Sequence, residues 1–101
     1  MNSSIRNGRT LFIPHPWEIE SQIFLMIDWE KVDYDYIRAY NRGNITAPEV
    51  AVRFPESVPD YYFQLATEMT KKLRTRSWWD VYEFINKDST FRRDYAKRCE
   101  L

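Results

Sequence analysis

Apolar residues recur at intervals of three and four along most of this chain, the spacing that places them on one side of an α-helix. The longest such stripe consists of Val58, Tyr62, Leu65, Met69 and Leu73 and would extend over about four turns. The pattern predicts a mainly α-helical protein. We expect residues 1–101 to form a single small domain of about five helices.

The N-terminal part of the chain is less regular. Ile19, Ile23 and Ile27 follow the helical spacing, which predicts a helix over residues 17–28, with a strand over residues 22–27 as the alternative. Residues 11–13 (Leu-Phe-Ile) could form a short strand or part of a hairpin, and residues 1–10 are expected to be a flexible arm. A further helix should end near Gly43, because glycine commonly follows a helix C-terminus.

Residues 46–76 contain the same helix-start signal twice, as Thr46-Ala-Pro-Glu49 and Ser57-Val-Pro-Asp60. In each, a hydroxyl can cap the first turn, proline fits early in that turn, and the acid reaches back toward the cap. Pro55 should end the first helix, so we predict helices over residues 47–54 and from about residue 58, joined by a turn of about three residues. A third signal, Ser77-Trp-Trp-Asp80, predicts another helix start.

This arrangement resembles the helix-turn-helix of small DNA-binding domains, including the trihelical and winged variants. The resemblance covers about a third of the chain. It rests on the two capping signals, on the small Ala51 where the two helices would cross, and on inward-facing Val50 and Phe54. It implies that the second helix lies in the major groove of DNA. The implied function is that of a small nucleic-acid-binding protein acting in transcription regulation.

The resemblance also implies which residues would contact DNA. By position, Tyr61 and Gln64 would lie at base edges or phosphates. The cations that would neutralise the DNA backbone are Arg42, Arg53, Lys71, Lys72, Arg74 and Arg76. Ordinary helix packing is the alternative explanation, because cations near a helix C-terminus also complement the helix dipole.

Residues 17–36, which we call the acidic aromatic segment, suggest a different function. The segment carries six carboxylates and one lysine among its aromatic residues. Aromatic side chains supply anchors at protein interfaces, and carboxylates steer a protein toward a basic surface. The expected contact residues are Trp17, Glu18, Asp28, Trp29, Asp33, Tyr34 and Asp35. The alternative function is therefore a small interaction protein, an inhibitor or adaptor that docks on a larger partner.

Charge and composition argue against several other classes of protein function for this chain. The net charge is zero, but residues 1–70 carry −4 and residues 71–101 carry +4, an asymmetry that can mark a partner surface. His15 lies between two prolines and Cys99 lies near the terminus, so we expect no enzyme activity, catalytic residue, metal or cofactor. The lone cysteine and the lack of a long apolar run predict a cytoplasmic protein with no membrane partner. A homodimer is left open.

Overall fold

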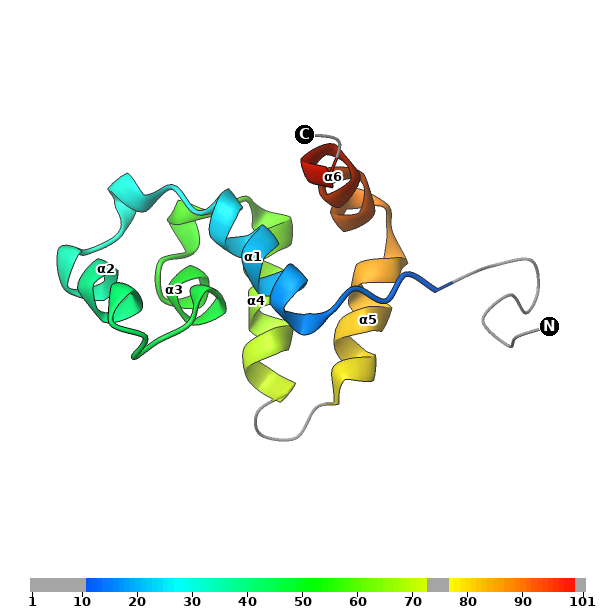
Figure 1. Ribbon diagram of the computed structural model, residues 1–101, viewed down its shortest axis with the longest axis horizontal. Helices are drawn as coiled ribbons and strands as arrows, with labels where there is room; N and C mark the ends of the chain where they lie inside the picture. The colour runs from blue at the N-terminus through cyan, green and yellow to red at the C-terminus, as the bar shows by residue number, and fades with distance from the viewer. Residues whose placement is uncertain (1–10, 73–76, 100–101) are drawn as a thin grey trace.

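Six α-helices and two short 3-10 helices make up the regular structure of residues 11–72 and 77–99, the part of the chain that the computed structural model describes (Figure 1). In chain order the elements are α1 (Pro16–Met26), η2 (Trp29–Lys31), α2 (Tyr34–Asn41), α3 (Ala47–Arg53), η3 (Pro55–Ser57), α4 (Asp60–Lys72), α5 (Trp78–Lys87) and α6 (Thr90–Cys99). The predicted mainly α-helical class is confirmed, with six helices in place of about five. Residues 11–72 and 77–99 contain no strand.

The N-terminal region folds as a helix that follows an extended segment. The helix expected over residues 17–28 is α1, and the alternative strand over residues 22–27 is wrong. Residues 11–13 are extended without a strand partner, because the side chain of Asn86 takes that partner's place. The Phe12 amide donates to Asn86 Oδ1 at 2.8 Å, and Asn86 Nδ2 donates to the Phe12 carbonyl at 2.9 Å. The predicted arm, residues 1–10, lies outside the described residues.

Two of the three predicted helix starts have the expected geometry. At the start of α3, the Thr46 amide donates to Glu49 Oε1 at 2.7 Å, and the Glu49 amide donates back to Thr46 Oγ1 at 3.4 Å. At the start of α5, the Ser77 amide donates to Asp80 Oδ2 at 3.3 Å. The predicted end of α2 is also confirmed, since Gly43 has φ +81° just after the helix, a value that favours glycine.

The helix start predicted at Ser57 is wrong. Ser57 is buried as the last residue of η3, and its hydroxyl donates to the Phe54 carbonyl at 2.7 Å, so it is not the cap of α4. The Asp28 amide donates to the Ser57 carbonyl at 2.6 Å, which fixes η3 against η2. Helix α4 begins only at Asp60. The connection between α3 and α4 therefore spans residues 54–59 and is longer than the predicted turn of about three residues.

Helix α4 is the element around which the core is built. It packs against α3, α5 and α1, which Figure 1 shows arranged around it. Its inner side is fully covered, with Tyr62, Leu65, Ala66 and Met69 all buried. Ala51 on α3 has no exposed surface, which is consistent with the close crossing predicted for α3 and α4. The buried apolar residues of the described chain form one cluster.

We expect the substitution Ala51→Glu to abolish folding. The new carboxylate would lie without a partner in a site that has no exposed surface, and burying such a charge costs on the order of 4 kcal/mol or more. That cost is a large part of the roughly 5–15 kcal/mol by which small domains are stable. Thermal melting followed by far-ultraviolet circular dichroism measures the effect. The matched control is Ala96→Glu on the exposed side of α6, and a wild-type melting curve for Ala51→Glu would refute the packing.

Candidate functional site

The solvent-facing side of α4 is the surface on which the helix-turn-helix resemblance depends. Asp60, Gln64 and Lys71 are exposed there, and Glu68 is half-buried between them. Gln64 Nε2 donates to Asp60 Oδ2 at 3.1 Å, and Lys71 Nζ lies 4.0 Å from a Glu68 carboxylate oxygen. The strip thus carries two carboxylates and one described cation. Its amide and its cation are already paired within the helix, and a negative strip repels phosphate.

Tyr61, the other expected base-contacting residue, points into the protein. Its ring stacks on Phe84 at a centroid distance of 5.2 Å and meets Tyr62 edge-on at 5.1 Å. Its hydroxyl oxygen is buried and has no hydrogen-bond partner of normal geometry in residues 11–72 and 77–99. Burial raises the pKa of Tyr61 well above the ordinary range, with a smaller increase from Asp88. This placement does not present Tyr61 to a base edge.

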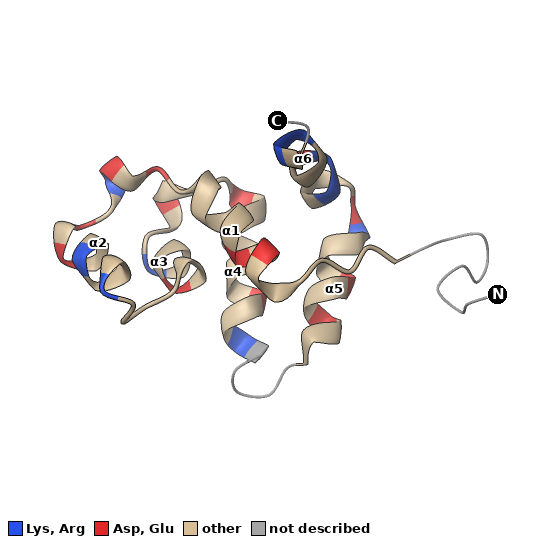
Figure 2. Cartoon of the chain, viewed as in Figure 1, with Lys and Arg blue, Asp and Glu red and all other residues tan. Residues whose placement is uncertain are grey.

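The expected phosphate-binding cations are spread over several elements. Arg42 is exposed at the end of α2, and Lys71 is exposed near the end of α4. Arg53 is exposed but engaged, because its Nε donates to the Tyr36 hydroxyl at 3.2 Å. The side chain of Lys72, together with Arg74 and Arg76, lies outside the described part of the chain. The described cations therefore lie at the ends of three different helices, and Figure 2 marks further lysine and arginine positions on α6.

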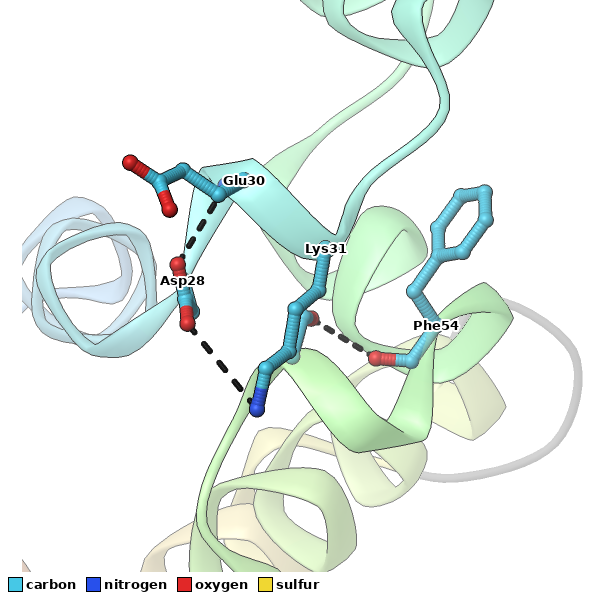
Figure 3. A network of polar contacts seen from close by, with 5 residues as sticks. Asp28, Glu30, Lys31 and Phe54 are labelled. Carbon is cyan, nitrogen blue, oxygen red and sulfur yellow. Dashed lines mark hydrogen bonds and ion pairs between the residues drawn. The ribbon is translucent and has the colours of Figure 1, made fainter.

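Most residues of the acidic aromatic segment that were expected to bind a partner are exposed. Trp17 at the start of α1 and Tyr34 at the start of α2 are 64% and 70% exposed. Asp33 and Asp35 beside Tyr34 are exposed as well. Asp28 is exposed while it caps η2, where it accepts from the Glu30 amide at 3.2 Å and lies 3.9 Å from Lys31 Nζ (Figure 3).

Two of the expected partner-binding residues are half-buried and stabilise the fold instead. Trp29 is half-buried, and its ring lies 5.4 Å from that of Phe24 and 5.2 Å from that of Tyr40. Glu18 is half-buried and caps α1 by accepting from the His15 amide at 3.2 Å.

Burial raises the pKa of Tyr95 to about 12, and the neighbouring side chains of Glu18 and Cys99 add to the increase.

The outer side of α1 contains exposed apolar residues that the helical spacing did not predict. Phe24 and Leu25 are 37% and 55% exposed, whereas Ile19 and Ile23 on the inner side are buried. The signal was present in the sequence, because residues 23–27 are a continuous apolar run. A helix that packs on one side cannot bury every residue of such a run, so some of them must face outward.

An open groove lies between α1, the end of α2 and the start of α3. Its volume is about 570 Å³, and its lining includes Trp17, Glu20, Phe24, Tyr40, Ile45 and Thr46. Phe24 stacks on Tyr40 at 5.5 Å, so aromatic rings form one wall. The volume lies within the range of ligand-binding pockets, but the groove is open to solvent and would cover only part of a ligand.

No protein-family model, curated protein or solved structure matches this chain. Within residues 11–72 and 77–99, no helix is long and apolar enough to cross a membrane. In the same residues, no three side chains of histidine, cysteine, aspartate or glutamate come together as metal ligands would.

Tyr62 differs from its neighbour Tyr61 in having two hydrogen-bond partners. Its hydroxyl donates to Asp94 Oδ2 at 2.6 Å and accepts from Gln22 Nε2 at 3.4 Å, which joins α4 to α6 and α1. Burial raises the pKa of Tyr62 well above the ordinary range, and the bond to Asp94 raises it further. The two adjacent tyrosines thus form a matched pair: the Tyr62 hydroxyl bonds two side chains, and the Tyr61 hydroxyl is buried with no partner of normal geometry in the described residues.

We predict opposite effects for the two tyrosine-to-phenylalanine substitutions. Tyr62→Phe should lower the free energy of unfolding by about 1–3 kcal/mol, because it leaves Asp94 and Gln22 without their partner. Tyr61→Phe should be neutral or stabilising, since the buried hydroxyl that it removes has no partner of normal geometry in the described residues and only a poorly aligned contact with the Phe91 backbone. Urea unfolding of both variants measures the difference. Equal losses of stability would contradict these placements.

Proposed function

We propose that this protein is a small non-enzymatic interaction protein that docks on a larger protein partner. The docking surface consists of the outer side of α1 and the start of α2, and we call it the α1–α2 face. It includes Trp17, Phe24, Leu25 and Tyr34. The single observation that carries the proposal is the distribution of exposed apolar side chains. Among the described residues, six of the seven large exposed ones lie between positions 11 and 34.

The chemistry of the α1–α2 face supports a protein partner. Exposed tryptophan and tyrosine are the residue types that most often contribute the largest share of binding energy at interfaces. Asp33 and Asp35 are exposed on either side of Tyr34 in the sequence, and the Arg38 guanidinium lies 5.7 Å from the centre of the Tyr34 ring. The two carboxylates would steer a basic partner surface toward this end of α2. Helix α1 is about 16 Å long, which is enough to hold several such anchors in one row.

Nucleic-acid binding in transcription regulation is the second candidate. It is supported by the close packing of α3 and α4 and by the exposed Lys71 at the start of a basic run in the sequence. It is opposed by the buried Tyr61 hydroxyl and by the two carboxylates on the outer side of α4. A cytoplasmic location and a homodimer stay predictions under either candidate.

Site-specific photo-crosslinking tests the main proposal. Benzoylphenylalanine is introduced at Leu25 or Tyr34, and the protein is irradiated in the cells that encode it. We expect a discrete protein adduct from both positions, because both side chains are exposed on the α1–α2 face. The matched control is Trp79, an exposed aromatic residue of α5 outside this face, which should give none. With the isolated partner, Leu25→Ser should weaken binding by roughly ten-fold.

Two results would contradict the main proposal. Adducts from Trp79 alone would place the interface elsewhere. Binding to mixed-sequence DNA, followed by fluorescence anisotropy, would support the second candidate if the affinity fell steeply with salt. That binding should then be lost when Lys71, Lys72, Arg74 and Arg76 are changed to glutamate. Under the main proposal we expect no such binding.

A further inference from the structure

The groove beside α1 has a corner suited to a positively charged side chain. Trp17 and Glu20 both line it, and they lie three positions apart on α1, so they are neighbours on its surface. An aromatic ring and a carboxylate side by side attract a cation in two ways, through the negative face of the ring and through the full charge of the acid.

The Trp17 ring is held in place before any partner arrives. One of its faces stacks on His15 at a centroid distance of 4.2 Å with an interplanar angle of 5°. His15 is in turn the N-cap residue of α1, where its amide donates to Glu18. With one face covered and 64% of the residue exposed, the other face remains open. A ring that is already ordered loses little conformational entropy on binding.

The charge of the groove points to a cation as well. Glu20 is the one charged residue among the side chains that line it. Arg42 is exposed nearby in the sequence but is not part of the lining. Beyond the corner, Phe24, Tyr40 and Ile45 offer apolar surface. A complementary ligand would therefore pair one positive group with a neighbouring apolar group.

We propose that the groove binds a short segment of the partner protein in which an arginine or lysine lies next to a large apolar residue. The cationic group sits between the open face of Trp17 and the Glu20 carboxylate, and the apolar side chain lies against Phe24 and Tyr40. This inference rests on the proposed function, because it assigns part of the α1–α2 face to one recognition motif.

Selection from a random peptide library displayed on phage tests the inference. The protein is immobilised, and the library is first depleted on the Phe24→Ser variant so that groove-independent binders are lost. We expect the enriched peptides to share an arginine or lysine beside a large apolar residue. Circular dichroism of Phe24→Ser must match that of the wild type, and if it does not, Ile45→Ser serves as the depleting variant. No enrichment, or enrichment of peptides without a cation, would overturn the proposal.

The enriched peptide with the highest affinity then tests the roles of Trp17 and Glu20. Replacing its arginine by neutral citrulline, or its lysine by acetyl-lysine, should weaken binding to the wild type by about ten-fold. Glu20→Gln and Trp17→Leu should each weaken binding of the cationic peptide by about five-fold and have little effect on the neutral one. The matched control is Glu30→Gln, which removes an exposed carboxylate outside the groove and should change affinity less than two-fold.

Other occupants would give different results. If light scattering detected a dimer of the wild type that Phe24→Ser dissociates, a second copy of the chain would fill the groove and the inference would be wrong. Crosslinks from Leu25 and Tyr34 without any groove-dependent peptide would leave the proposed function standing and overturn this inference alone. Leu25 allows this distinction because it is exposed on α1 but does not line the groove.

Discussion

The burial of α4 against three other helices is the constraint on which the rest of this structure depends. Leu65 and Ala66 have no exposed surface, and Tyr62 reaches partners on both α1 and α6. Two small residues, Ala51 on α3 and Ala66 on α4, are fully buried, which is consistent with close packing of the helices. Once α4 is enclosed in this way, little of its surface is left for a ligand. The solvent-facing strip of α4 contains the exposed Asp60 and the half-buried Glu68.

The same packing decides which surface remains open. Helix α1 covers the core with Ile19 and Ile23, and the described helices leave Phe24 and Leu25 on its other side exposed. Helix α2 contains no fully buried residue and is attached through half-buried aromatic side chains such as Tyr40. The rings of Phe24, Trp29 and Tyr40 contact one another and so connect α1 with α2. Because α1 has buried residues and α2 has none, we expect α2 to open locally more readily than α1.

Sequence reasoning succeeded where the determining interactions are local. The capping bonds of Thr46 with Glu49, and of Ser77 with Asp80, involve residues three apart, and both could be predicted. The helix start predicted at Ser57 was wrong because a distant contact, the hydrogen bond from the Asp28 amide, stabilises a 3-10 turn at that point. The same limit applies to Tyr61, whose partner Phe84 lies on another helix. Spacing alone cannot reveal such long-range contacts, although the run at residues 23–27 did contain the signal of a second apolar side.

Native-state hydrogen exchange, measured residue by residue, tests the central role of α4 most directly. We expect the amides of Leu65, Ala66 and Met69 to exchange only when the whole protein unfolds, with the same free energy as urea unfolding. The amides of α2, which has no fully buried residue, should exchange through local opening at a lower free energy. If the α4 amides exchanged as fast as those of α2, α4 would not be the element that the core is built on.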